Sequence, residues 1–411
     1  MSDLILNEGY QKNKVFFEKG LKDKITQNGK SYIDLSNSAG SLILGHNSKT
    51  FRNILKKYLK INGSIFAHPN NFAVDYSKTI KKFFPSFEKI IFCNSGTEAV
   101  TKALRISRTL NKNECIVSVA GSWHGSVDSL LFQPDAKFRP KFLSDGLSNN
   151  DKRKIIFIPY NNIEVSKKIL NKNKNKINSI IIEPIQACLP LNNSKLYLKF
   201  LEKFCNKNKI TLIFDEIITG IRSQKNSVQQ NYNIKPDITT IGKIVGGGMP
   251  IGIIGISKKV YKRIKEKKIF YGGTFSGNSI SSFVGNEILK YLIRNKQIIK
   301  KINKKSEYFQ NNLNKFILIN KMNLKIYRYS SILRIVYTNN KIDNRIQRDF
   351  FETKISNKIY NFKKFLFRKR IYYPSNGIIF FSDSTSYKNI DYVIENIKTG
   401  FKKYFTENNR K

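Results

Sequence analysis

The sequence has no long hydrophobic run and no apolar leader, and these two absences exclude whole classes of protein. No apolar stretch approaches the roughly 18–20 residues that a membrane-spanning helix needs. The first residues, MSDLILNEGYQKNK, lack a basic segment followed by an apolar run, so we expect no signal peptide. The sequence therefore predicts a soluble, cytoplasmic protein.

Cysteines are few, and the four that are present show no paired spacing. They lie within or beside apolar segments, where free buried thiols are common. A reducing compartment is the simplest interpretation of this usage. We assign no metal-binding residues. The cysteines are Cys93, Cys115, Cys188 and Cys205.

Acidic side chains are scarce, with 29 aspartates and glutamates against 74 lysines and arginines and a net charge of +45 at pH 7. Such a charge can indicate binding to nucleic acid or to an anionic membrane. The lysines are spread along the chain, however, and accompany many asparagines and isoleucines, which A/T-rich codons also encode. We therefore favour compositional drift over a specific nucleic-acid or membrane partner, although a basic enzyme would attract anionic substrates.

Length and hydrophobic pattern predict two domains, the larger of them α/β. At 411 residues the chain exceeds the size at which one hydrophobic core usually stops growing. Short apolar runs alternate with helix-length segments, which indicates a mostly parallel sheet buried on both faces. The seven expected strands are Ile90–Cys93, Cys115–Val119, Ile155–Pro159, Ser179–Glu183, Thr211–Asp215, Ile238–Ile241 and Gly252–Ile256.

The flanking regions predict a smaller α+β domain. Residues 24–36 have the pattern of a hairpin with Asn28-Gly29 as its turn. Residues 281–302 have the pattern of one long amphipathic helix, and shorter strands and helices follow. We expect residues 1–50 to form an N-terminal segment that packs with the small domain, residues 51–290 the large domain, and residues 291–411 the small domain.

A lysine and a carboxylate stand where ligands bind in such folds, at the carboxyl ends of strands. Asp215 ends one expected strand, and Lys243 follows another, ahead of three consecutive glycines. These are the two groups that a pyridoxal phosphate enzyme needs most, because the lysine forms a Schiff base and the carboxylate keeps the pyridine nitrogen protonated. The ordinary alternatives are a surface lysine and an acid that caps the next helix.

A possible phosphate site lies at residues 94–99, which follow a strand and open a helix pattern. A helix start presents free N–H groups and the positive end of the helix dipole. Gly96 permits close backbone approach, while Ser95 and Thr97 offer hydroxyl groups. The same pattern is also typical of an ordinary helix N-cap with Glu98 in the first turn.

Trp123 is the only tryptophan and follows another expected strand. A flat aromatic at this place could stack on a cofactor ring, with Ile217 against the opposite ring face. The alternatives are a core tryptophan beside a structural His124, and a core isoleucine. Residues 272–278 form a second cluster of glycines and hydroxyls, which could contact phosphate, form a flexible lid or be only a loop.

Together these segments resemble the class III (fold type I) pyridoxal phosphate-dependent aminotransferases, most closely the glutamate-1-semialdehyde 2,1-aminomutase branch. The resemblance implies a seven-stranded, mostly parallel large domain and a smaller α+β domain built from both termini. It covers about residues 30–290 and is carried, in the family's order, by LILGHN, NSGTEA, SWHG, EP, FDEIITGIR, TTIGKIVGGGMPIG and GGTFSGN.

The resemblance also implies roles for single residues. Lys243 would carry the Schiff base to pyridoxal 5'-phosphate, Asp215 would pair with the pyridinium nitrogen, and Glu183 would lie near the phenolic oxygen. Trp123 takes the place of the family's stacking aromatic. His124 and Ile217 are counted with it as cofactor-binding residues.

The phosphate group is implied to bind Ser95, Gly96 and Thr97. Thr274 would reach the phosphate of the neighbouring subunit's cofactor, which implies an obligate two-fold dimer with shared active sites.

The N-terminal segment departs from the aminomutase branch. Residues 15–22 contain no arginine, whereas that branch usually has one there to hold the substrate carboxylate. We therefore expect an aminotransferase that moves an amino group between an amino donor and a carbonyl acceptor, with the aminomutase as the alternative. A cationic nucleic-acid-binding or regulatory protein that kept the fold is a third hypothesis, which the intact lysine, aspartate and phosphate segment disfavour.

Overall fold

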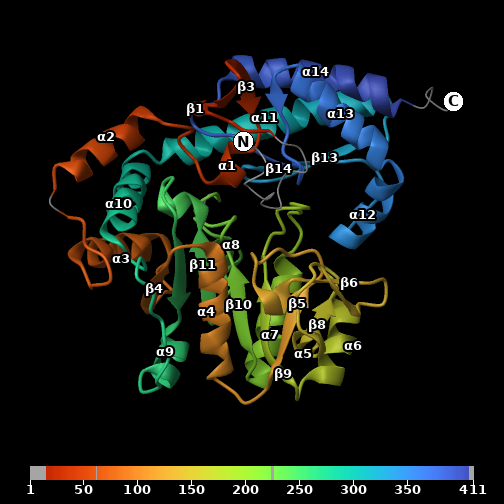
Figure 1. Ribbon diagram of the computed structural model, residues 1–411. Helices are drawn as coiled ribbons and strands as arrows, with labels where there is room; N and C mark the ends of the chain where they lie inside the picture. The colour runs from red at the N-terminus through yellow and green to blue at the C-terminus, as the bar shows by residue number, and fades with distance from the viewer. Residues whose placement is uncertain (1–14, 62, 224–225, 407–411) are drawn as a thin grey trace. The chain divides into compact units, whose positions relative to one another are not determined.

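The computed structural model describes residues 15–61, 63–223 and 226–406 (Figure 1). The signal-peptide expectation concerns residues 1–14 and so lies outside the described residues. The chain divides into two compact units. The larger comprises residues 53–296 with 342–347, and the smaller comprises the described residues up to 52, residues 297–341 and those from 348 onward.

The large unit is built on a seven-stranded sheet with the strand order β4-β12-β11-β10-β9-β5-β8 (Figure 1). Neighbouring strands are parallel except that β12 runs antiparallel to both β11 and β4. All seven strands expected from the sequence are confirmed. They are β4 (Lys89–Cys93), β5 (Cys115–Val119), β8 (Ile155–Ile158), β9 (Ile177–Ile182), β10 (Thr211–Asp215), β11 (Ile238–Gly242) and β12 (Gly252–Ile256).

The strands are rich in isoleucine because both faces of the sheet are covered by other parts of the unit. Every residue of β9, β10, β11 and β12 is buried, so polar and apolar positions do not alternate. Helix α4 packs on β4, β11 and β12, while α7 packs on β10 and α6 on β8. The helices of this unit include α3 (Asn71–Phe83), α4 (Gly96–Arg108), α5 (Asn149–Lys154), α6 (Ile163–Asn173), α7 (Lys195–Asn208), α8 (Val228–Tyr232), α9 (Lys258–Ile264) and α10 (Ser279–Arg294).

The small unit is α+β, as expected, and draws its elements from both ends of the chain. The predicted hairpin is confirmed, and Asn28 and Gly29 at its turn both have positive φ angles, of 47° and 69°. In the described part of the small unit, the strands form two sheets with the orders β1-β2-β3-β15 and β13-β14-β16. The strands are β1 (Lys19–Leu21), β2 (Lys24–Gln27), β3 (Lys30–Asp34), β13 (Lys325–Tyr329), β14 (Ile332–Val336), β15 (Ile371–Tyr372) and β16 (Ile378–Phe380).

The single helix expected over residues 281–302 is wrong, because the structure has two helices there. Helix α10 ends at Arg294, and α11 (Gln297–Ile319) begins three residues later. Asn295 leaves the helical region, with φ −121° and ψ 56°, and its backbone and side chain both donate to the Tyr291 carbonyl. The apolar periodicity continues across this break, so the pattern alone did not reveal it. The other helices of the small unit are α13 (Ser356–Arg368) and α14 (Tyr387–Phe405), while α2 (Lys49–Leu59) and α12 (Arg345–Lys354) cross the division between units.

Two further features bear on the expectations about protein class. Over the ranges that the structure describes, no helix combines the length and the apolar character needed to cross a bilayer. All four cysteines are thiols rather than disulfide partners, and of these Cys93 and Cys205 are buried.

A glycine lets β12 pack closely against the start of α4. Gly252 lies opposite Gly242 in the register of β12 and β11. A Cβ atom added at Gly252 would lie 2.0 Å from the Ser95 carbonyl oxygen, whereas one added at Gly242 would meet nothing closer than 3.4 Å. The end of β12 and the segment that precedes α4 therefore occupy fixed positions relative to each other.

We expect Gly252→Ala to lower the free energy of unfolding by roughly 1–3 kcal/mol, because the Ser95 backbone must move to admit the methyl group. Gly242→Ala is the matched control and should change that free energy by less than about 1 kcal/mol. Urea unfolding of the cofactor-free proteins measures both values. Equal losses in the two variants would contradict the close approach.

Candidate active site

The sheet brings a lysine and two carboxylates to one edge. Glu183 follows β9, Asp215 ends β10 and Lys243 follows β11, and these three strands are parallel neighbours. Burial lowers the pKa of Lys243, the positive charge of Arg222 lowers it further, and the charges of Asp215 and Glu183 oppose the shift. A lowered pKa favours the neutral amine, which is the form of lysine that acts as a nucleophile.

The backbone of Lys243 is also unusual, because its φ angle of 52° lies in the left-handed region. Residues with a side chain seldom adopt this conformation, and such strain gathers at functional sites. The left-handed turn directly after β11 sets the direction in which the lysine side chain leaves the sheet.

Asp215 is held by three hydrogen bonds in a buried position. Its Oδ1 accepts from the Ile217 N–H at 3.1 Å and from the Thr240 hydroxyl at 3.2 Å, while its Oδ2 lies 2.8 Å from His124 Nδ1. Each carboxylate oxygen has room for about two donors, so Oδ2 can accept one more. Among the described residues, the Nε2 atom of His124 is buried without a hydrogen-bond partner.

Glu183 titrates in the range where it can exchange a proton. Burial raises its pKa to about 7, and the neighbouring charge of Asp215 acts in the same direction. The Trp123 N–H donates to Oε1 at 2.7 Å and the Ala187 N–H to Oε2 at 3.4 Å. Near pH 7 both the acid and the carboxylate are therefore populated, which suits a proton donor or acceptor.

The start of α4 has the geometry of an anion site as well as that of an N-cap. Ser95 is the N-cap, and its hydroxyl accepts from the Glu98 N–H at 3.1 Å. The first N–H groups of a helix have no acceptor within the helix. The Thr97 hydroxyl accepts from the Ser126 N–H at 3.1 Å, and Gly125, with φ 78°, packs against it. The turn that carries Trp123 and His124 therefore lies against this helix start.

Trp123 and Ile217 lie at the same end of the sheet. Trp123 is 44% exposed, so it is not a core residue. Ile217 is half-buried, and its Cδ1 atom lies 2.7 Å from where a Cβ on Gly96 would stand. Ile217 also lies against Gly242, which precedes the lysine. It therefore fills the space between the helix start and the end of β11.

Thr274 stands apart from this group. It is exposed, and its carbonyl accepts from the Ala67 N–H at 2.9 Å. Within the described residues, no hydrogen bond joins it to Lys243, Asp215 or Glu183. The loop of residues 272–278 instead reaches the helix start through Ser276, whose hydroxyl lies 3.4 Å from Glu98 Oε1.

Sequence reasoning missed two buried polar residues near the site. Arg222 is fully buried, donates from Nε to the Ile218 carbonyl at 2.6 Å, and has its pKa lowered to about 9 by burial. Gln186 donates from Nε2 to the Ala120 carbonyl at 2.9 Å and the Ser122 hydroxyl at 3.1 Å. Arg222 closes the FDEIITGIR motif and could have been noticed there, whereas no signal in the sequence marked Gln186 as buried.

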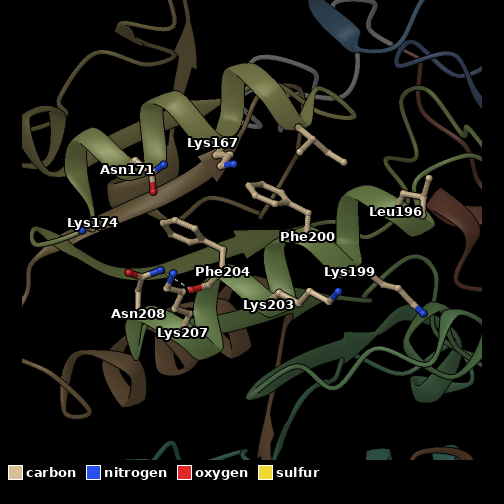
Figure 2. Close-up of a pocket in the computed structure, with 11 residues that line it drawn as sticks. Lys167, Asn171, Lys174, Leu196, Lys199, Phe200, Lys203, Phe204, Lys207 and Asn208 are labelled. Atoms are coloured by element: carbon tan, nitrogen blue, oxygen red, sulfur yellow. Dashed lines mark hydrogen bonds between the residues drawn. The ribbon is translucent and has the colours of Figure 1, made fainter.

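A separate groove of about 590 Å³ lies between α6 and α7 (Figure 2). Phe200 and Phe204 of α7 point toward α6 in this groove, and lysines stand around them. Among the described residues that line it, none is acidic and none belongs to the group around Lys243. Its lysines agree with the excess spread over the whole chain, so we do not place the active site there. They are Lys167, Lys174, Lys199, Lys203 and Lys207.

The residues at the sheet edge fit a phosphorylated pyridine aldehyde. They supply an amine with a lowered pKa, a carboxylate with a remaining acceptor position, a glycine-bearing helix start and an exposed aromatic side chain. These are the partners that an aldehyde, a ring N–H, a phosphate and a flat ring require.

Comparison with known proteins agrees with this chemistry. Residues 5–325 match the family described as Aminotransferase class-III. The glutamate-1-semialdehyde 2,1-aminomutase of Wigglesworthia glossinidia brevipalpis is 38% identical over 75% of this chain and 72% of its own length. The protein of the same name from Fusobacterium nucleatum is 32% identical over 95% and 90%.

Solved structures share the fold at lower identity. An omega-transaminase from Sphaerobacter thermophilus has a TM-score of 0.85 at 19% identity, covering 94% of this chain and 91% of its own. A glutamate-1-semialdehyde-aminomutase from Pseudomonas aeruginosa PAO1 has a TM-score of 0.83 at 14% identity, covering 95% and 88%. These two structures support the fold alone.

The raised pKa of Glu183 predicts a pH dependence of stability. Between the ordinary pKa of 4.5 and about 7, the folded protein keeps a proton that the unfolded chain has lost. The contribution of Glu183 is therefore full below pH 4.5 and declines by at most about 1.4 kcal/mol per pH unit as the pH rises through this window. Glu183→Gln stays neutral and should lack this decline.

Urea unfolding of the cofactor-free proteins at several pH values measures the effect as the difference between wild type and variant. Glu164→Gln, at an exposed acid on α6 that pairs with Lys168 3.1 Å away, is the matched control. Parallel curves for wild type and Glu183→Gln would refute the raised pKa.

Proposed function

Since the chain belongs to the class III aminotransferase family and is thus an enzyme that uses pyridoxal 5'-phosphate, we propose that it transfers an amino group from an amino donor to a carbonyl acceptor. The observation that carries this proposal is the half-buried Lys243, which follows β11 at one sheet edge with Asp215 and Glu183 and whose pKa is lowered by desolvation. A lowered pKa increases the share of neutral amine, which is the form that reacts with an aldehyde.

The bound cofactor supplies an aldehyde that carries the amino group and a protonated ring that withdraws electrons from the substrate's reacting carbon. Lys243 would hold the aldehyde carbon and, when displaced by the amino donor, move a proton at the substrate's α-carbon. Asp215 would accept the ring N–H at Oδ2, and the 2.8 Å contact with His124 orients the carboxylate for it. Glu183 would lie near the phenolic oxygen.

The remaining residues would position the cofactor. Ser95, Gly96 and Thr97 at the start of α4 would bind the phosphate through N–H and hydroxyl groups. Trp123 would stack on one face of the ring and Ile217 would pack against the other. The exposure of Trp123 and the place of Ile217 beside Gly96 support these roles.

We expect Lys243→Ala to lose the visible absorbance band that forms with pyridoxal 5'-phosphate and to lose amino transfer by at least about 10²–10⁴-fold. Lys258→Ala, at an exposed lysine of α9, is the control and should keep both. Titration with the cofactor and a screen of amino donors measure the two properties. A wild-type protein without the band would count against the proposal.

The second candidate is the intramolecular aminomutase reaction on glutamate-1-semialdehyde. It is favoured by curated relatives of that name at 31–38% identity. The lack of arginine in residues 15–22 favours the intermolecular reaction instead. Formation of aminolevulinate from glutamate-1-semialdehyde without an external amino donor or keto acid would decide for the aminomutase, because both amino groups then stay on one substrate.

We propose further that two copies of the chain form a dimer with shared active sites. Support comes from exposed aromatic side chains on and beside the loop of residues 272–278. Phe66, Phe270 and Phe275 are 40%, 75% and 55% exposed, and the rings of Phe66 and Phe275 lie 5.5 Å apart. Exposed apolar patches of this kind mark protein interfaces. Thr274, in the same loop, would reach the partner's phosphate.

Co-expression of Lys243→Ala with Thr274→Asp chains tests the shared site. Each variant alone should be inactive, because one lacks the amine and the other repels the phosphate. Random mixing makes half of the dimers heterodimers, and each heterodimer has one intact site out of two. We therefore expect about a quarter of wild-type activity. Activity no higher than that of the separate variants, or a monomer by sedimentation, would contradict the proposal.

A further inference from the structure

Lys102 is buried although the chain carries many exposed lysines. Its side chain is 5% exposed, and its Nζ atom lies 2.5 Å from Glu98 Oε1 one helical turn earlier on α4. The same Nζ atom lies 3.5 Å from the Ser276 hydroxyl. Lysine is almost never buried unless it is paired, so the excess of surface lysine does not account for this one.

Glu98 connects three segments of the large unit. Its Oε2 atom accepts from the Asn94 N–H at 2.7 Å, beyond the end of β4. Its Oε1 atom receives Lys102 and the hydroxyl of Ser276, from the loop of residues 272–278. Burial would raise the pKa of Glu98, but the bonds from Lys102 and Asn94 lower it overall, so the carboxylate is ionised at neutral pH.

An ionised carboxylate in this position conflicts with phosphate binding. Glu98 stands in the first turn of α4, whose opening residues are proposed to hold the cofactor phosphate. A phosphate group adds up to two negative charges at the same helix end, and like charges at short range repel. Cancelling the charge of Glu98 would therefore strengthen the binding of a phosphate at this helix start.

We propose that Lys102 is a positioning residue that cancels the charge of Glu98 beneath the phosphate site and, with Ser276, holds the 272–278 loop against the helix start. This inference rests on the proposed function, because its ligand is the cofactor phosphate. A pair that only stabilised the helix would affect every ligand alike, whereas charge cancellation affects ligands that carry the phosphate.

Lys102→Met keeps the length of the side chain and removes the charge. Titration of the cofactor-free protein, followed by the visible absorbance of the lysine adduct, gives affinities for pyridoxal 5'-phosphate and for pyridoxal, which lacks the phosphate. We expect the variant to bind pyridoxal 5'-phosphate about tenfold more weakly and pyridoxal within about twofold of wild type. Equal weakening of both ligands, or none, would overturn the proposal.

Three further variants sharpen the test. Lys102→Met combined with Glu98→Gln removes both charges and should restore much of the phosphate-dependent affinity. Glu98→Gln alone leaves Lys102 positive, should bind pyridoxal 5'-phosphate at least as tightly as wild type, and keeps the test decisive if Lys102→Met does not fold. Lys78→Met, at the exposed pair with Asp75 3.0 Å away on α3, is the matched control and should change neither affinity.

The outcomes separate this inference from the proposed function. A wild-type protein that forms no adduct with either ligand would reject the proposed function itself. A wild-type protein that forms both adducts, with a double variant as weak as Lys102→Met, would reject only charge cancellation by Lys102.

Discussion

The structure depends on one electrostatic constraint, which is a half-buried lysine placed with two buried carboxylates at the edge of an apolar sheet. Burial favours the neutral amine of Lys243, while Asp215 and Glu183 favour the charged one. Glu183 responds to the same burial by holding its proton up to about pH 7. Burial and neighbouring charges therefore act together on the pKa values of Lys243 and Glu183.

Close backbone packing brings the sheet edge and an adjoining turn against the start of α4, which is proposed to bind the phosphate. Gly252 lies against the Ser95 carbonyl, Gly125 against Thr97, and Gly96 against Ile217. A side chain at any of these positions would push the helix start or the adjoining turn away from the sheet edge. The glycines thus matter less for their own flexibility than for the short distance that they allow between the proposed phosphate site and the lysine.

Burial distinguishes two lysines from the general basic excess of the chain. The net charge of +45 comes from lysines and arginines spread along the chain, and the described residues that line the groove between α6 and α7 include five lysines and no acidic residue. Lys102 and Lys243 differ from them because each lies close to a carboxylate in a desolvated place, where electrostatic interactions are strong. The proposed chemistry uses these two lysines among many.

The sequence by itself determined the seven strands, the hairpin and the residues at the strand ends, because local apolar runs and turn residues encode them. It did not reveal the break at Asn295, since the apolar period continues across it. Only the tertiary structure decided that His124 meets Asp215, that Arg222 is buried, and that Glu98 joins Lys102 to Ser276. Such pairings join residues far apart in the chain or depend on burial, and both arise only when the sheet, helices and loops pack together.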